Sequence, residues 1–198
     1  MLLIYKTFRK INFICRQCIT TLNSTFYKFY FFLAGISGGK KIKVRGKLSL
    51  FITTGSKIHI GSNCQFNSIN YYNHLGINHN CIISTECKDA NIHIGNNCGF
   101  SGTSINCFKS IIIGDNVKCG ANTNIMDSDF HLDDTRTHPP RPIRIGSNVW
   151  LGTNVTVMKG VTIGENTIIG ANSIVTHDIP PSVIAAGNPC KVIKNIEQ

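Results

Sequence analysis

A six-residue period runs through the second half of the chain and sharply limits the folds that it can adopt. Aliphatic side chains occupy every sixth position without interruption. They are Ile145, Leu151, Val157, Ile163, Ile169 and Val175. A helix has no period of six and a plain alternating strand has a period of two, so the hexad is a structural unit of another kind.

A fuller form of the hexad extends the pattern toward the N-terminus. The motif aliphatic-Gly-x-Asn-small-x-apolar begins at Ile60, Ile94, Ile113, Ile145 and Ile163. Each hexad supplies a short strand whose aliphatic residue points inward, and its Gly and Asn tolerate the positive dihedral angles of a sharp corner. Three strands complete one triangular coil of about 18 residues, and stacked coils pair in parallel. The expected fold class is therefore all-β, a parallel β-helix.

Charge divides the chain into two parts. Residues 1–47 hold ten Lys and Arg and no acidic residue, whereas residues 48–198 hold ten of each sign. We therefore expect a basic, aromatic-rich, helical N-terminal arm over residues 1–47 and a β-helix domain over residues 48–198. The net charge of +10 is confined to the arm, so it does not predict nucleic-acid binding.

The arm has two open interpretations. It carries nine of the chain's 17 aromatic residues among its basic ones, which suits the interface of a membrane with anionic lipid. Alternatively, it packs as amphipathic helices on the body or on a neighbouring subunit. Its longest uncharged apolar run, Phe29 to Ile36, is too short to span a bilayer, and no signal peptide is evident. We expect a cytoplasmic protein, with peripheral contact at the inner face of the membrane as one role for the arm.

Cysteine and histidine do not predict a metal site or a disulfide scaffold. The nine cysteines are odd in number, and those within the repeat read as small buried hydrophobes. These are Cys64, Cys81, Cys98 and Cys119. We expect His59, His74, His79 and His93 to share no hexad phase, and a catalytic metal needs three convergent ligands.

The period stops between Ile125 and Ile143. The interrupting loop, residues 126–142, concentrates four acids, two His and two Arg. A loop of this length inside a repeat protein indicates function. The stretch 178–198 is expected to cover the C-terminal end of the β-helix, whose strand edges would otherwise be unpaired.

Residues 110–195 resemble a known family. The similarity is carried by the runs at 145–152, 160–166, 174–181 and 185–194, with sequences IGSNVWLG, GVTIGEN, IVTHDIPP and AAGNPCKVIK. These resemble the hexapeptide-repeat O-acetyltransferases, including maltose, galactoside and nodulation-factor acetyltransferases and those that modify capsular or colanic-acid-type polysaccharides. The resemblance implies a left-handed β-helix and a homotrimer with active sites between subunits. It also implies acetyl transfer from acetyl-CoA, a co-substrate and not a tightly bound cofactor, to a saccharide hydroxyl in polysaccharide biosynthesis.

The resemblance also assigns a catalytic base. His131 stands where the family places its loop histidine, which takes the proton of the attacking sugar hydroxyl. Asp127, Asp129 or a backbone carbonyl is expected to hold the other ring nitrogen. His138 is interpreted as a solvent-exposed loop residue.

Further site residues follow from the same resemblance. Trp150 is expected to wall the cleft, Ser101 to contact the acceptor, and a corner N–H such as that of Gly152 to stabilise the oxyanion. CoA contacts are expected at Gly152, Thr153, Ala171, Thr176, His177, Lys191 and Lys194. His177 departs from the family, which usually has Lys there.

Two alternatives stay open at this point. One is an acyltransferase for another acceptor, such as serine or an amino sugar. The other is a zinc-dependent carbonic anhydrase or a scaffold without activity, because left-handed β-helices host these as well.

Overall fold

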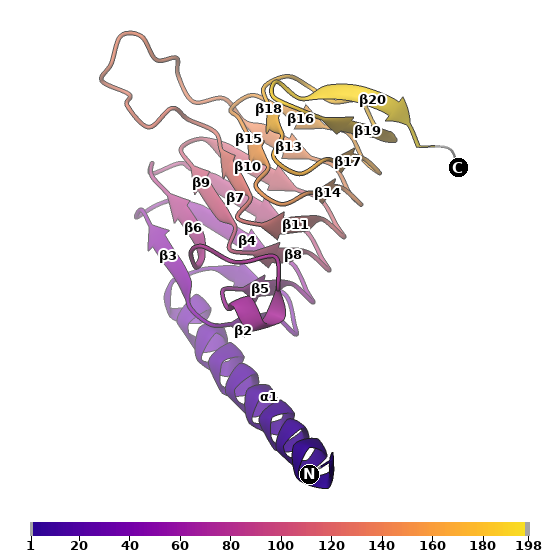
Figure 1. Cartoon of the computed structure of the whole chain (residues 1–198). Helices are drawn as coiled ribbons and strands as arrows, with labels where there is room; N and C mark the ends of the chain where they lie inside the picture. The colour runs from indigo at the N-terminus through magenta and orange to yellow at the C-terminus, as the bar shows by residue number, and fades with distance from the viewer. Residues whose placement is uncertain (1, 197–198) are drawn as a thin grey trace.

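The computed structural model of the chain describes residues 2–196, with side chains from residue 10 onward. Three parallel sheets, here called A, B and C, form the sides of a prism (Figure 1). Successive strands of the chain pass from sheet A to B to C and back to A, and one such circuit is a coil. The architecture is the left-handed parallel β-helix, as expected.

The strands of each sheet follow one another along the prism. Sheet A consists of β1 (Ser37–Gly38), β4 (Lys57–Ile60), β7 (Asn91–Ile94), β10 (Ser110–Ile113), β13 (Ile143–Ile145) and β16 (Thr162–Ile163). Sheet B consists of β2 (Lys43–Arg45), β5 (Gln65–Asn67), β8 (Gly99–Ser101), β11 (Lys118–Ala121), β14 (Trp150–Leu151), β17 (Ile168–Ile169), β19 (Val183–Ala186) and β20 (Lys191–Asn195). Sheet C consists of β3 (Leu48–Ile52), β6 (Cys81–Thr85), β9 (Ser104–Cys107), β12 (Asn124–Met126), β15 (Thr156–Val157) and β18 (Ile174–Val175).

The core is a column of inward-pointing hexad residues. Ile113, Ile145 and Ile163 are each at most 2% exposed, and they stack in register through β10, β13 and β16. Phe66 and Phe100 occupy the same position in successive coils, with ring centroids 5.0 Å apart and nearly parallel planes. The four repeat cysteines are buried, which confirms their interpretation as small hydrophobes.

Asparagine forms the corners of the prism. Asn116, Asn148 and Asn166 follow one another at the corner between sheets A and B, each with φ between 58° and 60°. Asn tolerates this left-handed conformation better than other residues with a Cβ atom. The side-chain amides of Asn116 and Asn148 also donate to the next Asn along the corner, at 3.0 Å and 2.9 Å. The repeated Asn therefore turns the chain and ties neighbouring coils together.

Both ends of the prism are covered. Helix α1 (Leu2–Leu33) extends from the N-terminal end, and its Tyr27 and Phe31 join the core (Figure 1). At the other end, β19 and β20 form an antiparallel hairpin. The helix confirms the expected helical arm, and the hairpin lies within the stretch that was expected to cover the C-terminal end. The boundary expected at residue 48 is wrong, because β1 and β2 already pair with the next coil and belong to the β-helix.

A few predicted features fall outside what the structure describes. The structure does not describe Met1 of the expected arm, or Glu197 and Gln198 of the expected β-helix domain. It also does not describe the side chains of residues 2–9 of the arm. Within residues 2–196, no helix combines the length and hydropathy that crossing a bilayer requires.

Two loops leave the prism. The longer one, residues 127–142, lies between β12 and β13 and projects from the corner between sheets C and A (Figure 1). We call it the flap. A second loop, residues 68–80, contains the 3₁₀ helix η1 (Asn70–Tyr72) and lies beside α1, where the guanidinium of Arg16 is 3.3 Å from the centre of the Tyr71 ring.

The expectation that the four histidines share no hexad phase is wrong for two of them. His59 and His93 face each other in β4 and β7, and their rings stack with centroids 4.7 Å apart. Each precedes an Ile-Gly pair, so the shared phase was visible in the sequence. The Nδ1 atom of His59 lies 2.9 Å from the Oγ of Ser37. In the part of the chain that the structure describes, no group of three His, Cys, Asp or Glu residues is placed to hold a metal ion.

Candidate active site

The base of the flap is fixed by a buried carboxylate. Asp127 is fully buried and accepts backbone N–H bonds from Phe108, Lys109 and Ser110 at 2.7–2.8 Å. The Cys107 Sγ also lies 3.5 Å from its Oδ2. Burial and the Asp127 carboxylate raise the pKa of the Cys107 thiol, which therefore stays neutral and able to donate. Asp127 thus anchors the first residue of the flap to the previous coil.

The next residues hold the backbone in a rare conformation. Phe130 has φ of 67°, in the left-handed region that bulky side chains seldom adopt. Its N–H donates to the buried Ser128 hydroxyl at 3.1 Å, and its ring meets that of Phe108 edge-on, with centroids 5.1 Å apart. Such strain persists only where the surroundings over-determine it, and it clusters at functional sites.

An ion pair closes the flap. Asp129 pairs with Lys159, whose side chain is only 8% exposed. Lys159 also donates to the backbone carbonyl of His138 at 2.7 Å. The hydrogen bond from Lys159, and then the His138 N–H, hold the pKa of Asp129 below its usual range. Sequence reasoning did not single out Lys159.

His131 follows this fixed segment directly. Its N–H donates to the Asp129 carbonyl at 2.9 Å, and its own carbonyl accepts from the Thr137 hydroxyl at 2.8 Å. The side chain is exposed. Backbone contacts on both sides therefore place an accessible imidazole at the start of the flap.

The expected orienting role of Asp127 and Asp129 is wrong for this chain on its own. Among the described residues, neither carboxylate is hydrogen-bonded to the His131 ring, because the first binds backbone N–H groups and the second binds Lys159. The two acids position the flap backbone instead. His138 is exposed, as predicted.

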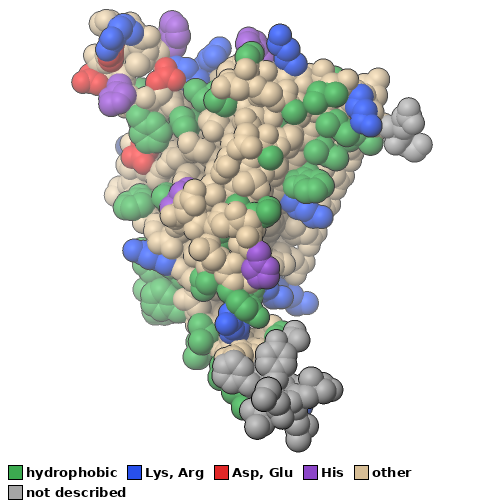
Figure 2. Space-filling model, viewed as in Figure 1, with side chains coloured by type: hydrophobic (Ala, Val, Ile, Leu, Met, Phe, Trp, Pro, Cys, Tyr) green, Lys and Arg blue, Asp and Glu red, His purple; other side chains and the backbone are tan. Residues whose placement is uncertain are grey.

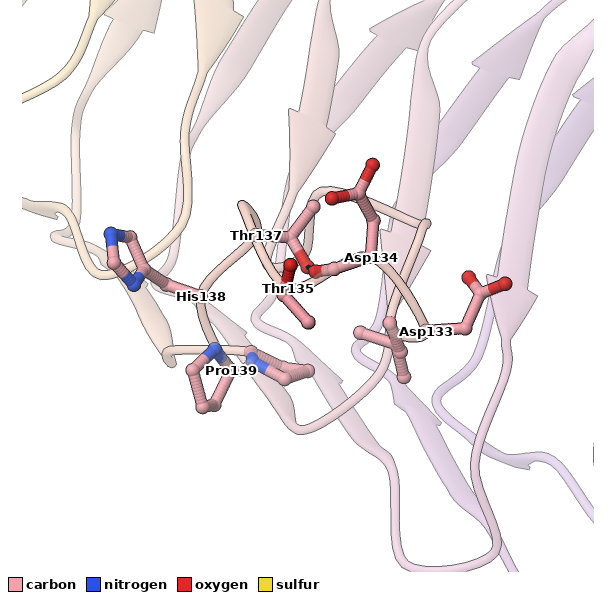
Figure 3. A pocket seen from close by; sticks show the side chains of 8 residues that line it. Asp133, Asp134, Thr135, Thr137, His138 and Pro139 are labelled. Atoms are coloured by element: carbon pink, nitrogen blue, oxygen red, sulfur yellow. Dashed lines mark hydrogen bonds between the residues drawn. The ribbon is translucent and has the colours of Figure 1, made fainter.

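The distal part of the flap lines an open pocket of about 360 Å³. Residues 132–135 and 137–140 line it, with His138 and Asp133 at opposite ends (Figure 3). Arg136 binds Asp134 through both carboxylate oxygens, which stiffens the turn. On the face drawn in Figure 2, acidic side chains gather around this loop.

The remaining predicted residues separate onto two corners. Ser101, Gly152, Thr153 and Ala171 lie at the corner between sheets B and C, at or just after the ends of β8, β14 and β17. The flap and Thr176–His177 leave the corner between sheets C and A. One chain therefore does not unite the predicted base with these four residues.

Individual contacts refine these assignments. The N–H of Gly152 donates to the Ile169 carbonyl at 2.8 Å, so it is not free to serve as an oxyanion donor, contrary to expectation. Gly152 is nonetheless required there, because a Cβ atom would lie 2.6 Å from the Ala171 nitrogen. Ser101 is 8% exposed, which leaves little of it for an acceptor.

The outward residues are accessible. Trp150 points outward from β14 and is 54% exposed, as predicted. Thr176 and His177 are exposed, with the Oγ1 of one 2.8 Å from the Nδ1 of the other. Lys191 and Lys194 are exposed on β20.

The fold and the flap define a hexapeptide β-helix, and sequence comparison agrees. The family model described as "Bacterial transferase hexapeptide (six repeats)" matches residues 142–177. The galactoside O-acetyltransferase of Escherichia coli (strain K12) is 44% identical over 55 residues, 28% of this chain and 27% of that protein. A Saccharomyces cerevisiae protein whose name proposes acetyltransferase activity is 40% identical over 92 residues, 44% of this chain and 47% of that protein. The chain spans less than half the length of either relative.

Solved structures show the same architecture. A galactoside acetyltransferase in complex with coenzyme A aligns with a TM-score of 0.51 and 30% identity, over 81% of this chain and 65% of that one. The S84A mutant of the Bacillus cereus N-acyltransferase AntD, in complex with dTDP-4-amino-4,6-dideoxyglucose and coenzyme A, aligns with a TM-score of 0.68 over 86% of this chain and 90% of that one, at 19% identity. The second likeness concerns the fold alone. The chain therefore contains the hexapeptide repeat over residues 142–177, and the relatives that match it in sequence are named acetyltransferases.

Proposed function

We propose that the protein is an O-acetyltransferase that moves acetyl from acetyl-CoA to a saccharide hydroxyl in polysaccharide biosynthesis, with His131 as general base. The observation that carries the proposal is the placement of His131, which is accessible and lies on a backbone fixed by the contacts of Asp127, Ser128 and Asp129. A general base must be rigidly placed within reach of the proton that it takes, and an imidazole, the side chain most often used for this task, on such a support meets that need.

The reaction follows from this placement. The His131 imidazole takes the proton of the acceptor hydroxyl while its oxygen attacks the thioester carbonyl. The tetrahedral intermediate collapses as the C–S bond breaks, and the CoA thiolate recovers a proton from the imidazolium. The products are the acetyl ester and free CoA, and the base returns to its starting state.

We also propose a homotrimer with the site between two subunits. His131 lies at the corner between sheets C and A, whereas Gly152, Thr153 and Ala171 lie at the corner between sheets B and C. A neighbouring copy that brings its B–C corner to this flap would unite the two groups. In a threefold arrangement, the flap of every subunit would meet the B–C corner of the next.

CoA would lie in a groove between the B–C corner of one subunit and the C–A corner of its neighbour. Thr176 and His177 on the C–A corner, and the exposed Lys191 and Lys194 on β20, would offer hydroxyl and cationic groups for its polar parts. Lys supplies charge to a phosphate, although it lacks the planar fork of Arg. Trp150 is exposed on the adjoining sheet and would wall the cleft, with the flap pocket on the acceptor side.

Thiol release from acetyl-CoA with a panel of acceptors tests this function. We expect release with saccharides and little with serine or amino-sugar nitrogen. Replacing His131→Ala should lower kcat by about 10²- to 10⁴-fold, the usual contribution of a general base. His79→Ala, in the 68–80 loop, is the matched control. Normal turnover by His131→Ala would show that the base is misassigned, and activity with serine alone would refute the saccharide acceptor.

We further propose that α1 makes peripheral contact with an anionic membrane. Its inner face packs Tyr27 and Phe31 into the core and is tied down by polar contacts. Asn23 donates to the carbonyls of Val44 and Gly46, and the Ser24 hydroxyl accepts from the N–H of Val44. Its outer face is apolar, with every member at least 51% exposed. That outer face comprises Ile11, Ile14, Ile19, Leu22, Phe26, Phe29, Phe32 and Leu33.

Charge favours lipid over a second copy as the occupant of this face. Residues 1–47 carry ten basic residues and no acid, so arms brought together would repel, whereas anionic headgroups would attract them. On the face drawn in Figure 2, apolar and basic side chains, and no acidic ones, surround the N-terminal end of the prism. Apolar insertion beside basic residues is how interfacial helices bind.

Vesicle co-sedimentation tests the membrane contact. The protein should bind vesicles rich in phosphatidylserine more than neutral ones, and less at high salt. The double variant Phe29→Ser/Phe32→Ser should lose this binding, whereas Ile193→Ser, an equally exposed change at the opposite end of the prism, should retain it. Equal binding by the double variant, or none by the wild type, would refute the contact.

A further inference from the structure

The side chain of Lys159 lies below the flap in an unusual environment. It belongs to the turn between β15 and β16, one coil beyond the flap, and only 8% of it is exposed. A buried ammonium is costly unless it is paired and hydrogen-bonded. Lys159 has both kinds of partner, the Asp129 carboxylate and the His138 carbonyl.

These two partners lie on the two segments of the flap, one before and one after His131. Asp129 precedes His131 by two positions, and His138 follows it by seven. One ammonium therefore joins the outgoing and returning segments. Arg141 completes the closure: its N–H donates to the Asp127 carbonyl at 2.9 Å, and its own carbonyl accepts from the N–H of Gly160 at 3.0 Å.

We propose that Lys159 is a positioning residue for the acyl transfer: its ammonium clamps the flap across Asp129 and the His138 carbonyl and so sets where the His131 imidazole stands. The proposal rests on the proposed function. Lys159 does not touch the reacting atoms in this arrangement. Its effect on the reaction passes through the backbone of residues 129–131, where the Asp129 carbonyl accepts the His131 N–H.

The clamp makes a specific kinetic prediction. Removing it leaves the imidazole present but loosely placed, and a displacement of about 1 Å can cost about 10²-fold in rate. The loss should appear in kcat, because the residues expected to bind CoA lie on other turns. The KM for acetyl-CoA should stay within about twofold of the wild type, since uniform binding is untouched.

Three variants test the clamp by steady-state kinetics with acetyl-CoA and the best saccharide of the panel. Lys159→Met keeps the length of the side chain without its charge and should lower kcat by about 10- to 100-fold. Lys159→Arg retains a donor for both partners and should recover part of the loss. Asp129→Asn weakens the same clamp from the other side, so Lys159→Met/Asp129→Asn should be little slower than Lys159→Met alone.

Lys57→Met, an exposed lysine on β4, is the control and should act like the wild type. Amide hydrogen exchange separates positioning from misfolding: residues 128–138 should exchange faster in Lys159→Met while the β-strands keep wild-type protection. Wild-type kcat in Lys159→Met, or multiplicative losses in the double variant, would overturn the clamp while leaving the proposed function intact. A wild type that transfers no acetyl group would instead refute the proposed function, and this positioning role with it.

Discussion

Asp127 offers the sharpest test of how the flap is held. Its Oδ1 accepts the N–H of Phe108, and its Oδ2 accepts those of Lys109 and Ser110, with the side chain fully buried. In Asp127→Asn, an NH2 group replaces one carboxylate oxygen and cannot accept a hydrogen bond, so at least one buried N–H loses its partner. An unpaired buried donor costs about 1–3 kcal/mol, and bonds to a charged acceptor are stronger than those to a neutral one. We expect the free energy of unfolding to fall by about 2–4 kcal/mol in total.

Urea unfolding followed by far-UV circular dichroism measures this change. Asp133→Asn, an exposed flap carboxylate, is the matched control and should alter the free energy of unfolding by less than about 0.5 kcal/mol. The kcat of Asp127→Asn should also fall, because the segment that carries the base loses its anchor. If Asp127→Asn unfolds at the same urea concentration as the control, the carboxylate does not anchor the flap and the reasoning fails.

Two further predictions concern the β-helix itself. Phe100→Ala removes a ring that is 1% exposed and stacked on Phe66. In urea titrations, the free energy of unfolding should therefore drop by about 3–5 kcal/mol. A loss below about 1 kcal/mol would show that the coils collapse to fill the space. Burial, and then the charge of His93, lower the pKa of His59, so the folded state binds the His59 proton less readily than the unfolded state does. Stability should therefore decline as pH falls below about 6.5 toward the folded-state pKa, and His59→Asn should show a shallower decline than His79→Asn.

The sequence predicts the fold well because the hexad carries its information locally. Each Ile-Gly-x-Asn unit specifies an inward residue and a corner, so no long-range pairing has to be guessed. The start of the β-helix was missed because Ser37–Gly38 and Lys43–Arg45 form strands without a full hexad. Their pairing depends on the coil above them, which a local pattern does not encode.

The site is less predictable because its contacts join distant segments. The resemblance points to His131 but assigns Asp127 and Asp129 to its ring, whereas the structure gives them to backbone N–H groups and to Lys159. Nothing near Lys159 in the sequence identifies its partner 30 positions away. The oxyanion assignment to Gly152 failed for a related reason, since coil stacking uses that N–H.

The central claim is that one subunit's imidazole serves the acetyl-CoA groove of its neighbour, and complementation between two inactive variants tests it most directly. His131→Ala lacks the base, and Ala171→Trp should block the groove; each alone should be at least about 10²-fold slower than the wild type. Co-expressed in equal amounts with different tags, they should form mixed trimers in which about a third of the sites, one in each trimer, combine an intact flap with an intact groove. We predict that mixed trimers purified through both tags recover transfer to about that fraction of the wild-type rate. Mixed trimers no faster than the two parents would contradict a site shared between subunits.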